Sequence, residues 1–228
     1  MSIPLLVEYY EELPRRRAKE DARAWRARRD AGVAAFRKLA EKRYNEGTLL
    51  RLLEYPSGRA RQAALMALGL FGTMASNAAV AARLRDPDPD VRGMASETIW
   101  SLWFRADTEA NNRELQRLMR LADPDDALAG YDRLIQRAPG FAEAYNQRAM
   151  LAFRRRDYRR SAADCARVLR LNPHHFGAQA GMAQCYLQLR KPRAALKAFR
   201  QALRINPYLD GVAETIRTLE KALGEDRK

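Results

Sequence analysis

The chain has 228 residues, of which 47% are hydrophobic and 31% are charged, and this composition excludes intrinsic disorder as its dominant state. No stretch approaches the roughly 18 consecutive apolar residues that a membrane-spanning helix needs, so we expect no membrane span. The formal net charge of +14 favours acidic partners, namely an acidic protein segment, nucleic acid or an anionic surface.

The first 45 residues are predicted to form a basic helical segment with a net charge of +5. They lack the basic start and long apolar core of a signal peptide. Residues 15–44 are expected to form one long helix, with Trp25 and Phe36 near the same face. Its cationic start, opened by the three arginines at 15–17, is either a solvated helix face or an electrostatic contact for nucleic acid or anionic lipid.

A faint repeat with an offset of 31 residues follows in residues 46–107, whose net charge is zero. Its two copies share a proline, a small apolar residue, an arginine and an alanine at the same spacing, namely Pro56, Ala60, Arg61 and Ala64, then Pro87, Val91, Arg92 and Ala95. This pattern resembles short HEAT-type repeats such as those of bilin lyases. Helices are expected at 49–53, 59–71 and 77–85, followed by a fourth helix capped by Asp90.

Two features of this region have a functional and a simpler interpretation. Trp100 and Trp103 lie three residues apart, and we expect core or junction packing in preference to a binding cage. The aspartates at 86, 88 and 90, with a later glutamate at 97, have the spacing of a calcium loop. However, Val91 stands where the sharp turn of such a loop needs glycine, so we expect an ordinary repeat turn.

The C-terminal half is organised by a constant spacing between Pro139, Pro173 and Pro207. This spacing, about 34 residues, and the small and aromatic positions within it resemble the tetratricopeptide repeat (TPR) family. The matching positions are Asn111, Glu114, Leu115, Leu118, Ala127 and Tyr131 in the first repeat, Tyr145, Arg148, Ala149, Ala152, Ser161 and Cys165 in the second, and Gln179, Met182, Ala183, Tyr186, Ala195 and Phe199 in the third.

Two residues depart from the family pattern, because Glu114 and Arg148 stand where an apolar residue is expected. We therefore expect looser packing in the first two repeats. Beyond the third repeat, an apolar stripe predicts a capping helix that ends at Gly224. The stripe consists of Val212, Ile216, Leu219 and Leu223.

The resemblance implies a concave groove lined by the first helix of each repeat. Carried over residue by residue, the peptide-binding positions are Asn112, Gln116, Asn146, Met150, Phe153, Arg154, Ala180, Gln184, Leu187 and Gln188. Amides beside apolar positions suit an extended peptide. The cations with which some TPR domains hold a C-terminal carboxylate are absent from the matching positions. Arginines at 154–156 and at 159 and 160 form either a wet loop or a basic rim that steers an acidic partner.

The sequence carries no catalytic, cofactor or metal pattern. His174 and His175 follow Pro173 and are expected in an exposed turn, without a third metal ligand at a plausible spacing. Cys165 and Cys185 have no metal spacing either, and a reducing, cytoplasmic setting is the simplest expectation.

We therefore predict an all-α protein, a right-handed α-solenoid of helix hairpins. Its segments are a basic N-terminal helical segment (1–45), HEAT-like repeats (46–107), three TPR repeats (108–209), and a capping helix with a tail (210–228). The predicted function is a non-catalytic scaffold or adaptor for a protein or peptide, for which the net charge leaves an acidic character open. A nucleic-acid-binding solenoid is the alternative, and a bilin-lyase-like enzyme is the least favoured one.

Overall fold

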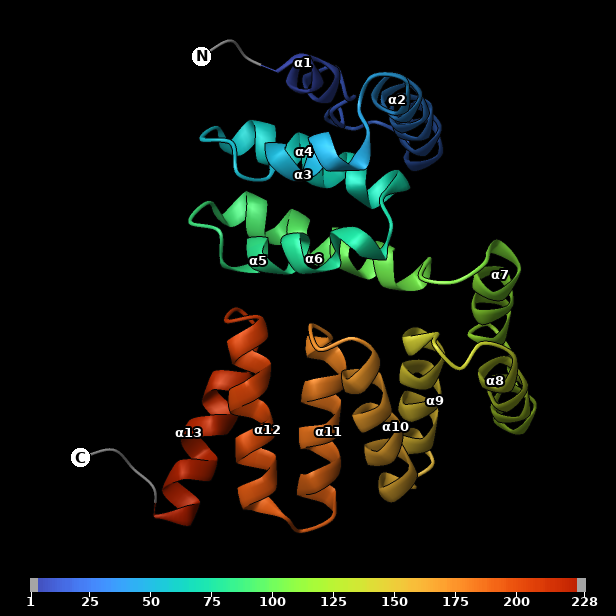
Figure 1. The fold of residues 1–228 in the computed structure, drawn as a ribbon, viewed down its shortest axis with the longest axis vertical. Coiled ribbons are helices and arrows are strands. Elements are labelled where there is room, and N and C mark those ends of the chain that lie inside the picture. Colours follow the sequence, from blue (N-terminus) through green and yellow to red (C-terminus); the bar gives the residue numbers. More distant parts are fainter. Residues whose placement is uncertain (1–3, 225–228) are drawn as a thin grey trace. The chain divides into compact units, whose positions relative to one another are not determined.

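The computed structural model describes residues 4–224. Its described residues form two compact units, which meet between Leu102 and Trp103 in the sequence. Within the described part, all regular structure is helical, with thirteen α-helices, two short 3-10 helices and no strand. Figure 1 shows the helices in chain order. The all-α prediction is confirmed, and none of the described helices has the length and apolarity that crossing a membrane requires.

The helices of the first unit are α1 (Leu5–Glu11), α2 (Ala22–Arg43), α3 (Glu46–Leu52), α4 (Gly58–Phe71), α5 (Asn77–Ala82) and α6 (Pro89–Phe104), whose last two residues belong to the second unit. The second unit continues with α7 (Glu109–Leu118), α8 (Pro124–Arg137), α9 (Ala142–Arg154), α10 (Tyr158–Leu171), α11 (Phe176–Gln188), α12 (Pro192–Ile205) and α13 (Val212–Leu223).

The N-terminal segment differs from the single helix predicted for residues 15–44. Helix α2 begins only at Ala22, because the side chain of Asp21 caps it by accepting hydrogen bonds from the backbone N–H groups of Arg23 and Ala24, at 2.9 and 3.0 Å. These bonds also lower the pKa of Asp21. The sequence analysis missed α1, which buries Leu6 and Val7.

The two HEAT-like copies form the hairpins α3–α4 and α5–α6, and the structure explains their shared arginine. The Nη1 atom of Arg61 donates to the carbonyl oxygens of residues 55 and 56, at 2.8 and 2.9 Å. Arg92 makes the same pair of bonds to residues 86 and 87, at 2.9 and 3.0 Å. Each arginine therefore ties the start of its helix to the turn that carries the repeat's proline.

The prediction that Asp90 caps the fourth helix is wrong by two residues. The cap is Asp88, whose Oδ1 accepts from the backbone N–H of Asp90 at 2.9 Å, because Pro89 already occupies the first helical position. Asp86 is buried and pairs with Arg61 at 2.9 Å. These carboxylates thus serve as cap and ion-pair partner in a repeat turn.

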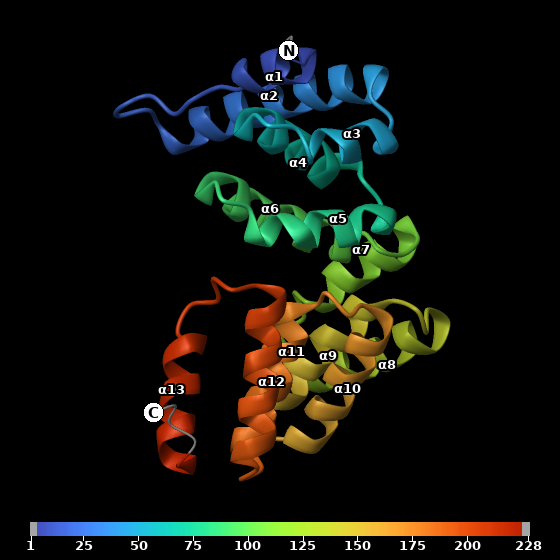
Figure 2. The ribbon, with the colours of Figure 1, turned by 60° about the vertical axis from the view of Figure 1, so that its left-hand side comes forward.

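In the second unit, the helices pair as α7–α8, α9–α10 and α11–α12, as the repeat period predicts. Pro124 and Pro192 occupy the first turns of α8 and α12. The small residues expected at close helix contacts are buried, with Ala183 and Ala195 at 0% exposure. In Figures 1 and 2, α11 and α12 lie side by side along most of their length.

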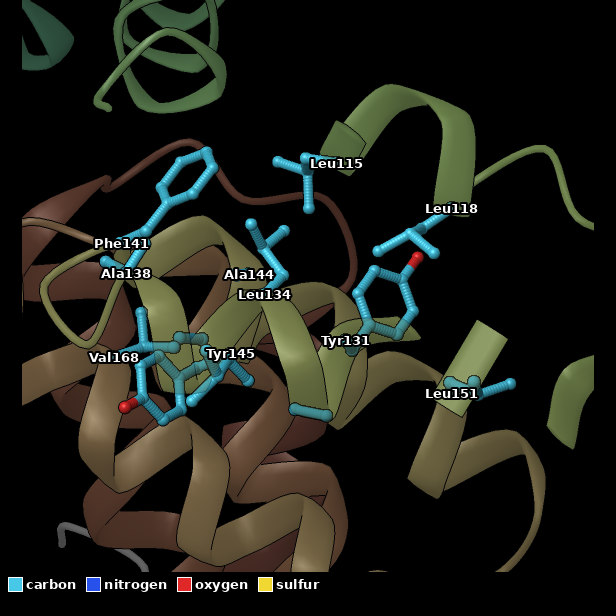
Figure 3. Packing of buried hydrophobic residues seen from close by; sticks show 14 of the residues in the cluster. Leu115, Leu118, Tyr131, Leu134, Ala138, Phe141, Ala144, Tyr145, Leu151 and Val168 are labelled. Carbon is cyan, nitrogen blue, oxygen red and sulfur yellow. The ribbon is translucent and has the colours of Figure 1, made fainter. Parts of the chain in front are cut away.

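A continuous core joins the first two hairpins of this unit. Figure 3 shows Leu118 of α7 next to the ring of Tyr131 of α8, with Leu134, Phe141 and Tyr145 in the same cluster. The two helices approach closely because α8 has a glycine there, Gly130. An added Cβ at that position would lie 2.1 Å from Leu118 Cδ2, so a larger residue would force the Leu118 side chain to move.

Arg148 does not loosen the second repeat as predicted, because its charge has partners. Its Nε and Nη2 atoms donate to both carboxylate oxygens of Asp164, at 2.8 and 2.6 Å. Its Nη1 atom donates to Asp132 of the preceding repeat at 2.7 Å, and these bonds raise the pKa of Arg148. A bidentate, half-buried ion pair thus replaces the expected apolar contact.

We expect Arg148→Leu to cost about 3 kcal/mol of unfolding free energy, although it restores the residue type of the family pattern, because the carboxylate of Asp164 would stay buried without its partner. Chemical denaturation followed by circular dichroism measures the loss. The double variant Arg148→Leu/Asp164→Ala should recover most of it, and a single variant as stable as the parent would contradict this account of the pair.

The capping helix is confirmed as α13. Ile216 is buried, and the other members of its apolar stripe pack against the same cluster as Ala195 and Phe199 of α12. Gly224 ends the helix with a φ of +66°, in the left-handed conformation that glycine adopts without a steric cost.

Candidate functional site

The ten residues predicted to bind a peptide, here called the first-helix face, fall into four rows whose members are one repeat period apart. These rows are Asn112, Asn146 and Ala180; Gln116, Met150 and Gln184; Phe153 and Leu187; and Arg154 and Gln188. They lie on α7, α9 and α11, the first helices of the three hairpins.

Two of the four rows are exposed. The side chains of the second row and of the fourth row are open to solvent, and Met150 keeps 47% of its surface. A large apolar side chain that remains exposed between amides is available to a ligand. The accessible part of the first-helix face is therefore Gln116, Met150, Gln184, Arg154 and Gln188.

The two asparagines of the first row are engaged in hydrogen bonds within the protein. Asn146 is buried, and its Nδ2 donates to Glu143 Oε1 at 2.9 Å. Asn112 is half-buried and binds the backbone of Asp107 through both ends of its amide, at 3.2 and 2.8 Å. Only free amides could bind a peptide backbone at these positions. The amides of both asparagines are already hydrogen-bonded within the protein, so they are not available to a ligand.

The third row lies between core and surface. Phe153 is half-buried, and its ring meets that of Tyr158 edge to face, with centroids 5.2 Å apart. Leu187 is half-buried as well. The same row continues in the first repeat with Met119, which is 44% exposed. The sequence analysis missed Met119, although its place one repeat period before Phe153 was the available signal.

The arginines around the α9–α10 turn divide into paired and unpaired groups. Arg155 forms an ion pair with Asp125, and Arg160 with Asp132 at 2.8 Å. Arg154, Arg156 and Arg159 are exposed and form no ion pair with any other described residue. Three cations of this turn are thus available to a partner.

The prediction that both histidines lie in an exposed turn is wrong, because His175 is completely buried. Its Nε2 lies 3.0 Å from Glu143 Oε2, whose carboxylate is also buried. Its ring stacks on that of Trp103, with centroids 4.1 Å apart and planes 16° apart. His174 is half-buried.

The hydrogen bonds of His175 indicate which of its two ring nitrogens donates. Nδ1 accepts from the backbone N–H of Ala178 at 3.0 Å, which caps α11, so the ring proton lies on Nε2 and is donated to Glu143. The other carboxylate oxygen of Glu143 accepts from Asn146 and Gln147, at 2.9 and 2.7 Å. These hydrogen bonds connect the second repeat to the third. We call His175, Glu143, Asn146 and Gln147 the buried polar cluster.

The N-terminal basic segment uses part of its charge internally. Arg28 donates to both carboxylate oxygens of Glu20, at 3.0 and 2.8 Å, and this holds the pKa of Glu20 at about 2. The guanidinium of Arg28 also lies 5.2 Å from the ring centroid of Trp25. The arginines at 15–17 stay exposed, so both interpretations of this segment remain predictions.

Within residues 4–224 there is no group of three or more His, Cys, Asp and Glu side chains that could hold a metal ion. Cys165 and Cys185 are buried free thiols on α10 and α11, and Cys185 donates to the hydroxyl of Ser161 at 3.1 Å. These polar groups are engaged with each other inside the repeats.

Comparison with known proteins matches two repeat families. The model of HEAT repeats matches residues 45–130, and that of the tetratricopeptide repeat matches residues 152–208. A TPR repeat-containing protein of Rhizobium etli is 31% identical over 150 residues, which cover 63% of this chain and 72% of the relative. The chain therefore belongs to the TPR repeat-containing proteins, with HEAT-like repeats before its TPR array.

Solved structures with lower similarity include two TPR complexes. The first TPR of Spaghetti, bound to an HSP90 peptide, has a TM-score of 0.44 and 21% identity, and the match covers 51% of this chain and 89% of that one. The TPR2AB domain of yeast Sti1, in a complex with HSP90, has a TM-score of 0.44 and 15% identity, with coverages of 89% and 95%.

The family matches place the repeat types differently from the predicted boundary. The HEAT match extends through α7 into α8, which the repeat register assigns to the first TPR. The division into HEAT-like repeats at 46–107 and TPR repeats at 108–209 stays a prediction.

Proposed function

We propose that this protein is a non-catalytic adaptor that binds an extended segment of a partner protein on its first-helix face. The observation that carries the proposal is the exposed row Gln116, Met150 and Gln184, which repeats at the same position of three successive hairpins. Membership of the TPR family supports it. The free cysteines fit a reducing, cytoplasmic setting, which is part of the proposal.

The chemistry of the row suits a peptide in extended conformation. Glutamine amides at two positions can pair with the backbone N–H and C=O groups of such a segment, and Met150 between them offers an adaptable apolar contact. Arg154, one turn further along α9, adds a charge that steers an acidic partner. The apolar contact supplies affinity, and the amides supply orientation.

A crosslinking experiment tests where the partner binds. A photoreactive residue at position 150 should form adducts with a protein partner, whereas the same residue at position 136 should not, because Gln136 is also exposed but lies on the second helix α8. Mass spectrometry of the adduct identifies the bound segment. Adducts that appear only at position 136, or that contain nucleic acid and disappear after nuclease treatment, would contradict the proposal.

Titration with the identified segment then measures the contribution of the row. We expect Met150→Gln/Gln184→Ala to weaken binding by about tenfold or more, because an exposed apolar anchor and a paired amide are lost. Both positions are solvent-exposed, so the melting temperature should stay near that of the parent. Gln136→Ala is the matched control, and an equal loss of affinity in this control would place the site elsewhere.

A further inference from the structure

The turns between the two helices of the second and third TPR hairpins carry exposed cations on one edge of the unit. Figure 1 shows the α9–α10 and α11–α12 turns at the same, lower end of these helices. We call this surface the turn edge. It consists of five exposed residues that lie outside the first-helix face, namely Arg156, Arg159, Arg190, Lys191 and Arg193.

The α9–α10 turn has the geometry of a Schellman motif, in which two backbone bonds close the end of a helix. The N–H of Arg156 donates to the carbonyl oxygen of Phe153, and that of Asp157 to Ala152, both at 2.9 Å. Such a closure needs a left-handed residue in its second-to-last position, which is usually glycine. Here Arg156 holds it, with a φ of +63°.

The α11–α12 turn repeats this geometry one period later. The N–H of Arg190 donates to Leu187 at 3.0 Å, and that of Lys191 to Tyr186 at 2.8 Å. Arg190 has a φ of +55°. An arginine thus occupies the left-handed position of the same motif in two successive repeats.

Each of these arginines imposes a steric cost on the turn. A side chain with a Cβ is disfavoured in the left-handed region, whereas glycine adopts it freely. Arg156 and Arg190 are exposed and form no ion pair with any described residue. No ion pair within the fold therefore offsets the steric cost of their left-handed backbone conformation. Strained backbone conformations of this kind cluster at functional sites, and exposed guanidinium groups without an ion-pair partner in the fold are suited to binding an anion.

Two observations favour a protein over a nucleic acid as the source of that anion. A hollow next to the cations is lined by Lys191, Pro192, Arg193, Ala194 and Leu223, and its apolar floor suits an aliphatic side chain. The aromatic ring of the α9–α10 turn, Tyr158, is half-buried against Phe153 and does not present a stacking surface for bases.

We propose that the turn edge is a second binding surface, which takes an acidic protein segment that also carries an apolar side chain. The guanidinium groups of Arg156 and Arg190 are suited to pair with carboxylates, since their planar donors match the two oxygens of a carboxylate. The hollow beside Arg193 receives the apolar side chain. This surface is independent of the first-helix face and does not require that face to bind a peptide.

The test uses two double variants that remove equal charge. Arg156→Gly/Arg190→Gly removes both strained arginines, whereas Arg217→Gln/Lys221→Gln removes two exposed cations from α13. The probe is a fluorescein-labelled polyglutamate peptide containing leucine, titrated by anisotropy against the full chain. We expect the glycine variant to bind about tenfold more weakly and the α13 variant to bind almost as the parent does, with all affinities falling as salt rises.

The same variants give a second readout that separates charge from folding. Because glycine relieves the left-handed strain, the glycine variant should melt on the order of 2–4 °C above the parent while it binds more weakly. A lower melting temperature would show that the arginines stabilise the turns and would overturn the proposal. Equal losses of affinity in both double variants, or tighter binding of an oligodeoxythymidylate than of the peptide, would overturn it as well.

Discussion

Replacing His175 with alanine should cost about 3–5 kcal/mol of unfolding free energy, a large fraction of the stability of an ordinary domain. The substitution removes the donor to the buried carboxylate of Glu143, the cap on Ala178 and the ring stacked on Trp103. The carboxylate would keep its amide donors but lose the one on its second oxygen. Urea unfolding followed by circular dichroism measures the effect.

Two further variants show whether the buried polar cluster around His175 explains this loss of stability. His174→Ala is the matched control, because His174 is adjacent and less buried, and its cost should stay within about 1 kcal/mol. Glu143→Gln in the His175→Ala background should recover part of the stability, since it removes the buried charge. A His175→Ala protein as stable as the parent would show that the buried cluster contributes nothing.

Ala195→Arg should destabilise the array by roughly 4 kcal/mol or more, because it forces a long charged side chain into a contact without space or water. Ala195 is 0% exposed and belongs to the cluster that joins α12 to α13. The melting temperature should fall by many degrees, as differential scanning calorimetry would show.

The control for this change is Ala213→Arg, at an exposed position of α13. It adds the same side chain to a helix surface and should alter the unfolding free energy by no more than about 0.5 kcal/mol. If Ala195→Arg melted like this control, the alignment of the repeat register with the helix contacts would be wrong.

The helices of the second unit could be predicted from sequence because the signals are periodic and local. Evenly spaced prolines, small residues at contacts and turn residues such as Pro124 and Pro192 all specify the same hairpins. Helix α1 lacked such a signal, since seven residues are too few to show a period. The start of α2 was misplaced because the cap at Asp21 lies within a run of charged residues that all favour helix.

The candidate site was predictable in register but not in accessibility. The rows of the first-helix face follow from the repeat, yet Asn146 is buried by a bond to Glu143 and Asn112 is held by Asp107. His175 could not be placed from its neighbours in sequence, because the partners that bury it come from α6 and α9. Arg148 was interpreted as a defect for the same reason, since its carboxylates lie in other helices.

The polar contacts across the repeat boundaries limit the modularity of this array. Arg148 reaches back to Asp132 in the preceding hairpin, and His175 reaches back to Glu143. In a repeat protein, such contacts strengthen the coupling between nearest neighbours relative to the stability of each repeat alone. The three hairpins are therefore expected to unfold in one cooperative transition, and deletion of the middle hairpin would remove the partners of both Asp132 and His175.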